Sequence, residues 1–553
     1  MSRDRELATG NLVNRPLTHG QTDNALTART RLLVGAAHAA MARKAPLSRT
    51  ACLSPRWRAP SRLPSLQQWG PWLQVGGAQP GLRRPPRTLS RWSLVVAGTV
   101  LMATAAWAED SPFRSDVGPV PAYPQRSGDP EAGYQALVNE PYVSCGIPYR
   151  AYRRVAPDTP PEQQLPGRVG RSSELPYSLT AHRNADGVEV LSSNCLTCHA
   201  ARFNGELVVG LGNEFLDFTR DPRRFVNEVG AYVRGEAETA AWQKWADRIE
   251  GIAPYIRTDT VGVNPATNLT WALMAHRDPR SLAWSASPLM ESPPRQPLPV
   301  SVPPWWRMAK KHAMFYTTLG RGDHARFMIL ASALCADSVA EARTVDAYAP
   351  DMRAYIASLK PPAYPWSIKP TLADAGRELF ERQCSRCHGS YAEDATYPNQ
   401  VVALDEVGTD PEYALAATDG REDRFYRWLS DSFYGELARP EPARGYIAPP
   451  LDGVWATAPY LHNGSVPDLA TLLESSRRPR FWRWRGDTPA FDQQTLGYEF
   501  EALPQGKSGE SDLDARSRIY DTTLRGYGNA GHTFGDPLSA EERRAVLEYL
   551  KSL

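Results

Sequence analysis

Two apolar segments of the chain have almost the same sequence. Residues 355–359 read Tyr-Ile-Ala-Ser-Leu, and residues 549–553 read Tyr-Leu-Lys-Ser-Leu. Each is preceded by a segment with helical periodicity: Gly376 and Phe380 lie one turn apart on one predicted helix face, and Asp129–Tyr134 opens in a similar way. A glycine on such a face lets two helices cross closely. The pattern predicts two units, each with a closing helix packed across its first helix.

A Pro-rich stretch, residues 360–365, follows the first closing segment and predicts a linker. The last helix begins at a predicted capping box, Ser539–Glu542. Strand-like alternation is sparse, and the chain contains 49 prolines, which favour turns and loops. We therefore expect a mainly α fold with long loops and few short strands, divided into a first domain over residues 109–365 and a second over 366–553.

The first 108 residues follow another pattern. Residues 1–85 are rich in Arg, Pro, Gly and Ala without a sustained period, which is typical of a non-native extension from an early start codon or of a disordered pre-sequence. Residues 86–108 contain a basic stretch, the apolar run Ser93–Ala106 and the cleavage pattern Ala106–Ala108. Because the run is shorter than the ~20 residues that span a bilayer, it predicts a cleaved signal peptide, a periplasmic or secreted protein and no membrane span after cleavage.

Charge is distributed unevenly along the chain. Residues 1–108 hold 15 of the 63 Lys and Arg but only 3 of the 61 Asp and Glu, which leaves residues 109–553 with a net charge near −10. An acidic body argues against nucleic acid as a partner, because phosphate backbones bind basic surfaces. A basic redox partner protein or a neutral substrate suits this charge better.

Two Cys-x-x-Cys-His strings, Cys195–His199 and Cys384–His388, carry the chemistry. This is the attachment signature of haem c, in which two thiols add to the vinyl groups of one porphyrin and the histidine ligates the iron. Two strings predict two covalently bound haems, one in each of the two domains, which are then expected to be cytochrome c-type haem domains. The residues involved are Cys195, Cys198, Cys384 and Cys387 for attachment and His199 and His388 as proximal ligands. The remaining cysteines of the body, Cys145 and Cys335, form either a disulfide or two buried thiols.

The sixth iron ligand decides between electron transfer and catalysis, because a saturated iron cannot bind dioxygen or peroxide. The last methionine is Met352, so the second domain cannot supply a thioether to its own haem. His532, in a Gly-rich loop before the last helix, is the preferred sixth ligand of that haem, and His462 is the alternative.

Residues 303–316 are the candidate surroundings of the first haem, because they are aromatic and cationic. In this interpretation a tryptophan relays electrons between the haems, and the cations neutralise propionates. A core helix with the aromatic residues as packing is the alternative. The residues concerned are Trp305, Trp306, Arg307, Lys310 and Lys311, with Met308, His312 or Met314 as ligands that would close the site.

The string Ala456–Ser465 resembles the A-P-Y-x-H-x-G segment of the di-haem cytochrome c peroxidase superfamily. Within it the chain is most similar to the rubber oxygenase branch, secreted enzymes that cleave poly(cis-1,4-isoprene) with dioxygen. This likeness depends on the wide haem spacing and on three further strings: Pro304–Trp306, Gly320–His324 and Gly528–His532.

The resemblance implies roles for individual residues. His199 would hold the active haem, whose distal side binds dioxygen, while His388 and His532 would hold a bis-histidine haem. The catalytic positions implied are Trp305 or Trp306 as the bridging residue and Phe315 or Phe327 over the active haem.

The activity implied is oxidative cleavage of a C=C bond in an apolar organic substrate, with dioxygen as co-substrate. Two alternatives stay open at this point. A di-haem hydroperoxidase would use peroxide and a redox partner protein, and a periplasmic electron-transfer cytochrome would have two six-coordinate irons.

Overall fold

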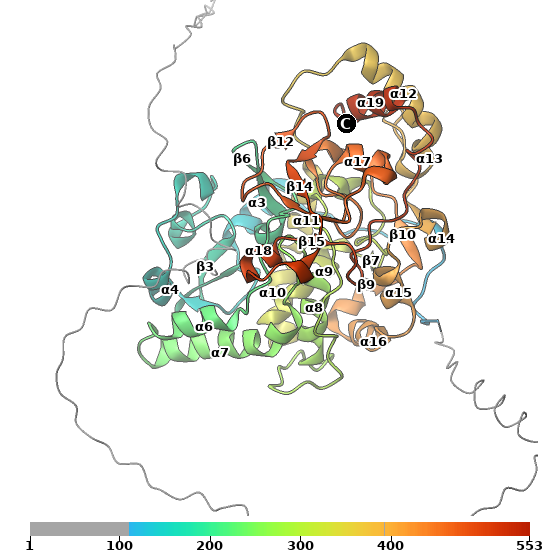
Figure 1. Cartoon of the computed structure of the whole chain (residues 1–553). Coiled ribbons are helices and arrows are strands. Elements are labelled where there is room, and N and C mark those ends of the chain that lie inside the picture. Colours follow the sequence, from blue (N-terminus) through green and yellow to red (C-terminus); the bar gives the residue numbers. More distant parts are fainter. Residues whose placement is uncertain (1–109, 392) are drawn as a thin grey trace, which may run out of the picture. The chain divides into compact units, whose positions relative to one another are not determined.

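The computed structural model describes residues 110–391 and 393–553, which are coloured in Figure 1. The extension predicted over residues 1–85 and the signal peptide predicted over 86–108 lie outside these residues. The described residues belong to one compact unit. Among them, no helix is long and apolar enough to cross a membrane.

The two helix crossings predicted from the repeated segments are confirmed. Helix α3 (Pro130–Asn139) packs against α11 (Ala349–Ser358), and α12 (Pro370–Gln383) packs against α19 (Ala540–Leu550). Figure 1 shows the second pair side by side next to the C-terminus. Each pair joins the beginning of one half of the described chain to its end.

A glycine makes each crossing possible. A Cβ atom on Gly133 would lie 1.9 Å from the carbonyl oxygen of Asp351, and one on Gly376 would lie 1.9 Å from that of Ala545. Any side chain at either position would therefore force the helices apart.

The expectation of a mainly α fold is wrong. The described residues are about 39% helix and 13% strand, and they contain six small antiparallel sheets of two or three strands each. The strands are so short that alternation of apolar and polar residues cannot reveal them. In strand order the sheets are β1–β8–β10 (Gly118–Pro119, Gln400–Ala403, Gly445–Ile447), β2–β4–β3 (Ile147–Pro148, Glu189–Ser193, Leu179–Arg183), β5–β6 (Ala200–Phe203, Glu206–Val209), β7–β9 (Gly320–Gly322, Ala438–Pro440), β14–β11–β15 (Phe500–Ala502, Phe481–Trp484, Tyr520–Asp521) and β12–β13 (Phe491–Asp492, Gly497–Tyr498).

The other helices lie between these strands along the chain, and Figure 1 labels most of them. Most are short, and the longest is α7. They are α4 (Tyr149–Val155), α5 (Leu196–His199), α6 (Arg223–Gly230), α7 (Glu236–Ile252), α8 (Ala266–Ala275), α9 (His324–Met328), α10 (Val339–Asp346), α13 (Ser385–His388), α14 (Leu404–Val407), α15 (Glu412–Thr418), α16 (Asp423–Asp431), α17 (Leu469–Leu473) and α18 (Leu513–Ser517), with the 3-10 turn η4 at Trp305–Lys310 among the short turns.

Two large apolar clusters form the core. The first contains Leu196 and Trp305, and the second contains Trp306 and Phe380. Trp428, which follows the predicted linker, packs in the first cluster. Side chains from both sides of residue 365 therefore share one cluster, and the domain boundary at that residue stays a prediction.

Cys145 and Cys335 form a disulfide, with Cα atoms 5.4 Å apart. Of the two alternatives for these cysteines, the disulfide is thus confirmed. It joins the chain just before β2 to the chain just before α10, across a sequence separation of 190 residues.

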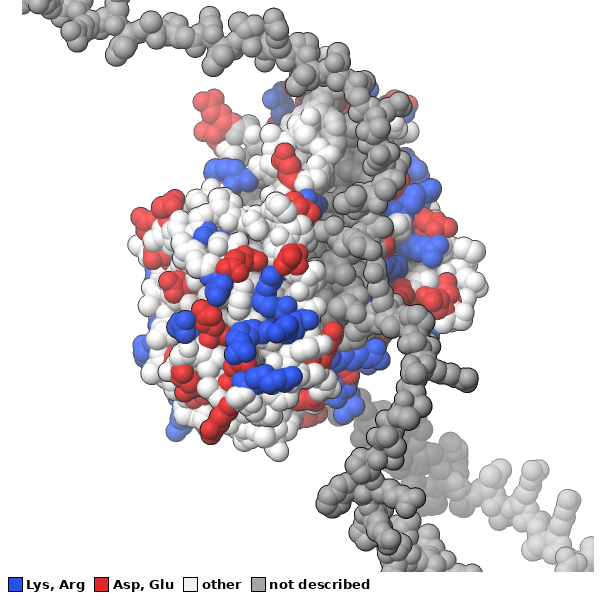
Figure 2. Space-filling view, turned by 90° about the vertical axis from the view of Figure 1, so that its left-hand side faces the viewer, with Lys and Arg blue, Asp and Glu red and all other residues white. Residues whose placement is uncertain are grey.

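Charged side chains are mixed on the face that Figure 2 displays. Lys and Arg gather in one cluster there, among scattered Asp and Glu. The net negative charge of the body is therefore not spread evenly over its surface.

Candidate functional site

The first Cys-x-x-Cys-His string forms the single helical turn α5, between β4 and β5. Asn194 starts the turn, because its Oδ1 accepts a hydrogen bond from the Leu196 N–H at 3.0 Å. The His199 N–H then donates to the Cys195 carbonyl oxygen at 3.1 Å. Cys195 and Cys198 carry free thiols. Both thiols and the imidazole therefore come from one compact turn.

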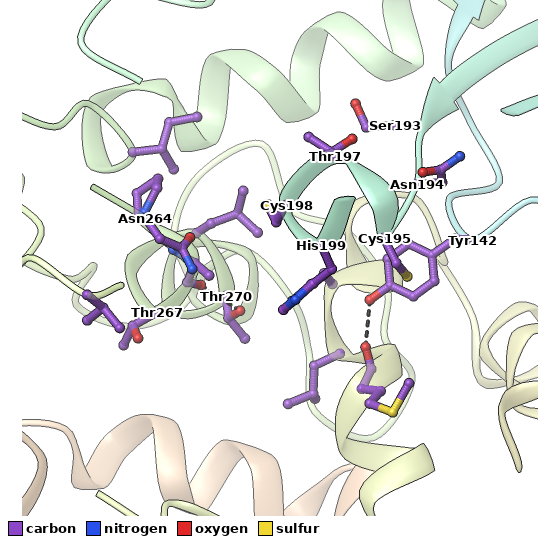
Figure 3. Close-up of a pocket in the computed structure, with 18 of the residues that line it drawn as sticks. Tyr142, Ser193, Asn194, Cys195, Thr197, Cys198, His199, Asn264, Thr267 and Thr270 are labelled. Carbon is purple, nitrogen blue, oxygen red and sulfur yellow. Dashed lines mark hydrogen bonds between the residues drawn. The ribbon is translucent and has the colours of Figure 1, made fainter. Parts of the chain in front are cut away.

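A cavity of about 560 Å³ lies beside this turn and is lined by Cys195, Cys198 and His199. Figure 3 shows the His199 imidazole extending from α5 towards Thr270 and Thr267 on the far side. Most of the other lining is apolar and includes Trp271, Met308, Met314, Phe315, Leu319, Phe327 and Met328. Such a volume with an apolar wall is typical of a cofactor or small-molecule site.

The tandem tryptophans of η4 belong to different apolar clusters. Trp305 stacks on His199, with ring centroids 4.8 Å apart and 21° between the planes. The indole N–H of Trp306 donates to the Asp452 carbonyl oxygen at 2.8 Å. Adjacent residues thus connect the His199 cavity with the second cluster.

Phe315 and Phe327, the two candidates for an aromatic residue over the first haem, both line the cavity. Their rings contact each other edge to face, with centroids 5.5 Å apart. Gly320 leaves room for Phe315, because a Cβ there would lie 3.0 Å from that ring. The two phenylalanines are therefore neighbours in the cavity wall.

The other ligands proposed for the first haem separate into two groups. Met308 and Met314 line the cavity, whereas the His312 Nδ1 is turned to the Val120 carbonyl oxygen at 2.7 Å. His324 also lines the cavity, and its two ring nitrogens have no hydrogen-bond partner within the described residues. Burial lowers the pKa of His324 to about 4, so this imidazole is neutral at pH 7.

The three cations predicted near propionates have different partners. Lys310 forms an ion pair with Asp452, with Nζ 2.7 Å from Oδ1. Arg307 lines the cavity and donates through Nε to the Asp452 carbonyl oxygen at 3.2 Å. Lys311 lines the cavity as well, and burial lowers its pKa to about 8. Arg307 and Lys311 are thus positioned to face a charged group in the cavity, and Lys310 is held by Asp452.

The second Cys-x-x-Cys-His string forms α13, directly after α12. Its Cys384 and Cys387 are free thiols. The His388 N–H donates to the Cys384 carbonyl oxygen at 3.0 Å, and the His388 Nδ1 lies 2.8 Å from the Pro449 carbonyl oxygen. An imidazole that donates from Nδ1 to a carbonyl presents its Nε2 to a metal.

His532 lies across from His388, with ring centroids 6.1 Å apart. An imidazole nitrogen lies about 2 Å from a metal that it ligates, so two imidazoles on opposite sides of one ion have centroids roughly 6 Å apart. The observed separation fits one iron between the two rings. Burial lowers the pKa of His532 to about 3, so its imidazole is neutral at pH 7, the state that ligates metals.

The loop that carries His532 is held by Arg478 and by a close backbone contact. The Arg478 guanidinium donates to the carbonyl oxygens of Gly531 at 2.6 Å and His532 at 3.1 Å. A Cβ on Gly531 would lie 2.1 Å from the carbonyl carbon of Gly408. These contacts fix the backbone at Gly531 and His532, and therefore the position from which the imidazole extends.

His462, the alternative ligand, has other neighbours. It is buried, and its ring stacks on Tyr446 with centroids 4.0 Å apart. The structure thus brings His388 together with His532 and packs His462 against a tyrosine.

These residues fit a haem c at each string. Among the described residues, no group of three or more His, Cys, Asp or Glu side chains lies close enough to hold a metal ion, but a haem iron takes its equatorial ligands from the porphyrin. Each string supplies two free thiols and an imidazole from one helical turn. Burial lowers the pKa of His199 to about 4, so it too is neutral at pH 7.

The segment that supports the second string is similar to a known family. Residues 445–483 match the RoxA-like, cytochrome c-like family. The RoxA-like segment supplies Pro449 behind His388 and Asp452 beneath η4. A cytochrome c-like segment implies covalently bound haem c. Membership of the di-haem cytochrome c peroxidase superfamily and a total of two haems stay predictions.

Two curated relatives from Sinorhizobium fredii (strain NBRC 101917 / NGR234) are similar to parts of the chain. Uncharacterized protein y4iM is 28% identical over 36% of this chain and 52% of its own length. Uncharacterized protein y4iJ is 29% identical over 35% of this chain and 41% of its own length. The chain thus spans about half the length of the curated relatives that it matches.

Sequence reasoning missed the groups that support the histidines. Pro449 and Arg478 are distant in sequence from the residues that they hold, and no spacing rule connects them. Glu214 accepts hydrogen bonds from the Ser301 hydroxyl at 2.8 Å and the Val302 N–H at 2.9 Å, just before η4. Nothing in the local sequence marks it, because Asn213 and Asp217 are polar neighbours that give it no distinct pattern.

Proposed function

We propose that this protein is an exported di-haem c-type cytochrome, and that dioxygen reacts at the His199 site to cleave a C=C bond of an apolar substrate. One contrast supports the proposal. The ring centroids of His388 and His532 lie 6.1 Å apart, whereas His199 lines a cavity of about 560 Å³. An iron between two imidazoles is saturated, and an iron with a vacant position can bind dioxygen.

The chain itself provides the surroundings of the reaction. A haem c attached at Cys195 and Cys198 would supply the redox-active iron. Phe315 and Phe327 keep the cavity apolar, which favours an alkene over water. Cleavage of one C=C bond by one dioxygen gives two carbonyl groups, so the atoms balance without an external electron donor.

Trp305 and Trp306 are the proposed connection between the two haems. Trp305 stacks on His199, and Trp306 packs in the second cluster. Arg307 follows them and lines the cavity, and its charge adds to burial in lowering the pKa of His388. Electrons or a positive charge can therefore pass through adjacent residues of one turn.

Export is supported by the disulfide between Cys145 and Cys335. Disulfides persist in oxidising compartments outside the cytoplasm. Attachment of haem c to thiols belongs to the same compartment, so the two features favour one location.

The first test counts haems and open irons. The protein is produced with a haem c maturation system, its haem content is measured as the pyridine haemochrome, and the reduced protein is titrated with carbon monoxide. We expect two haems per chain and one carbon monoxide bound. A single haem, or two bound carbon monoxide molecules, would contradict the proposal.

His324 favours one alternative, because it places a second neutral imidazole in the cavity wall. If it ligates the first iron, both irons are saturated and the protein is an electron-transfer cytochrome. In that case carbon monoxide leaves the reduced spectrum unchanged, and His324→Ala restores binding of one molecule.

The second test identifies the product. The protein is incubated with polyisoprene or a small alkene under ¹⁸O₂, and products are analysed by mass spectrometry. We expect aldehyde and ketone products with both oxygens labelled. Turnover of hydrogen peroxide with a reduced cytochrome, without any alkene product, would support a hydroperoxidase instead.

A further inference from the structure

A second cavity of about 900 Å³ adjoins the one at His199. It lies under the Pro-rich segment 288–298 and beside α16. Four residues line both cavities: Asn264, Pro265, Thr267 and Tyr413. The two cavities therefore share part of their walls.

A hydrogen bond lies at the border between the cavities. The hydroxyl groups of Thr267 and Tyr413 lie 3.2 Å apart. Tyr413 is buried, so this bond is not part of the outer surface. It stands where a ligand in the second cavity would have to pass to reach the first.

Guanidinium groups surround the second cavity. Arg421 is paired with Asp419 at 2.5 Å, and Arg525 with Glu412 at 2.7 Å. The other two arginines of the lining, Arg295 and Arg424, form no ion pair within the described residues.

Arg424 is nevertheless held in place. Its Nε donates to the Glu291 carbonyl oxygen at 2.9 Å and its Nη2 to that of Ser292 at 3.3 Å. Its guanidinium also lies 4.4 Å from the ring centroid of Phe425. These partners hold the guanidinium in place, and its charge opposes the effect of burial on the pKa of the Glu422 carboxyl.

We propose that the second cavity binds a long-chain carboxylate, with its head group at Arg295 and Arg424 and its chain directed past Thr267 and Tyr413 towards His199. This inference rests on the proposed function and specifies its substrate class: an unsaturated amphipath with an anionic head, in place of a neutral polymer. Arginine binds carboxylates through charge-assisted hydrogen bonds, which a neutral hydrocarbon cannot use.

The rest of the lining suits such a molecule. Met290, Leu298 and Phe425 provide apolar contacts for a chain. The carboxyls in the lining are Glu291 and Glu422, and burial raises the pKa of Glu422 to about 7. At neutral pH Glu422 is therefore only partly charged, and the arginines outweigh the carboxylates.

The test compares two ligands that differ in the head group alone. The haem-loaded protein is titrated calorimetrically with cis-9-octadecenoate and with cis-9-octadecen-1-ol, below their aggregation limits. We expect the carboxylate to bind about tenfold more tightly. The double variant R295Q/R424Q should lose this preference.

Arg427→Gln is the matched control. Arg427 lies on α16 like Arg424, but it is exposed and does not line the cavity. The control should keep the tenfold preference. If the double variant does not fold, Arg295→Gln alone serves, since Arg295 is exposed, and should reduce the preference about threefold. Equal binding of the two ligands, or an equal loss in the control, would overturn the inference.

Failure of the inference and failure of the proposed function give different results. Tight carboxylate binding without oxygen consumption leaves the second cavity assigned and refutes the oxygenase. Oxygen consumption with polyisoprene, but without any preference for the carboxylate, supports the oxygenase and refutes the anionic substrate.

Discussion

At the scale of single residues, the histidines of the two Cys-x-x-Cys-His strings differ in the groups that surround their rings. His388 has a carbonyl behind it, from Pro449, and an imidazole before it, from His532. His199 has Trp305 stacked on its ring and a cavity beside it. The same five-residue string therefore creates two chemically distinct positions, because the partners come from other parts of the chain.

Replacement of His532 tests this distinction. We expect His532→Ala to open the second iron, because its imidazole would be removed from the far side of His388. Carbon monoxide binding to the reduced protein should rise by one molecule per chain, and a low-spin bis-histidine signal should disappear from the electron paramagnetic resonance spectrum. His462→Gln is the control, since this buried side chain stacks on Tyr446. An unchanged spectrum in His532→Ala would contradict the assignment.

Glu214 provides a prediction of pH dependence. Burial raises the pKa of Glu214 to about 8, whereas the unfolded chain titrates near pH 4. Between these values the unfolded state has lost a proton that the native state retains, so the free energy of unfolding falls as the pH rises. Glu214→Gln keeps the acceptor for Ser301 and removes the titration.

We therefore expect the free energy of unfolding of the native protein, relative to that of Glu214→Gln, to fall on the order of a few kcal/mol between pH 5 and pH 8. Denaturant titrations at both pH values measure this difference. The exposed Glu206→Gln should show no such trend. A native protein and a Glu214→Gln variant with parallel pH profiles would show that Glu214 is ionised in the folded state.

At the scale of elements, the chain is organised by two similar helix crossings. A Cβ atom added to Gly133 or to Gly376 would lie 1.9 Å from a carbonyl oxygen of α11 or of α19, respectively. The repeated Tyr-x-x-Ser-Leu segments and the glycines were sufficient to predict these crossings. The sheets were not predictable in the same way, because strands such as Gly118–Pro119 are fixed by partners far away in sequence. The periodicity of apolar residues indicates a long helix, but it cannot indicate a strand of two residues.

Alanine at the glycines should separate the helices. In Gly376→Ala the new Cβ would collide with the Ala545 carbonyl oxygen, and overpacking of this kind destabilises proteins by about 1–3 kcal/mol. Ala375→Gly is the control at a neighbouring exposed position of α12, with an expected loss of about 1 kcal/mol from helix propensity. Thermal unfolding monitored by circular dichroism measures both. A Gly376→Ala variant as stable as the native protein would show that α12 and α19 do not touch at this point.

At the scale of the whole molecule, contacts between distant segments determine the site. From its motifs alone the sequence predicted that His532 pairs with His388, and the two rings lie 6.1 Å apart; the haems and the role of His532 as a ligand stay predictions. Residues 303–316 and Phe327 were predicted near the first haem, and most of them line the cavity. The rest of the wall was not predictable, because Thr267, Tyr413 and His324 come from separate helices. Their approach depends on how the apolar clusters pack, and packing of long-range partners leaves no local pattern.

The disulfide between Cys145 and Cys335 is the covalent form of such a long-range contact. It closes a loop across 190 residues, and cross-links of this kind stabilise proteins by about 2–4 kcal/mol, chiefly by restricting the unfolded chain. In the proposed di-haem protein, the cysteines of the two Cys-x-x-Cys-His strings would form thioethers, which dithiothreitol does not reduce. Reduction of the haem-loaded protein should therefore act on this bond alone and lower the unfolding temperature without loss of haem. The double variant Cys145→Ser/Cys335→Ser should be equally labile and insensitive to dithiothreitol. If reduction left the unfolding temperature unchanged, the disulfide would make no contribution to the stability of the fold, and the prediction would be wrong.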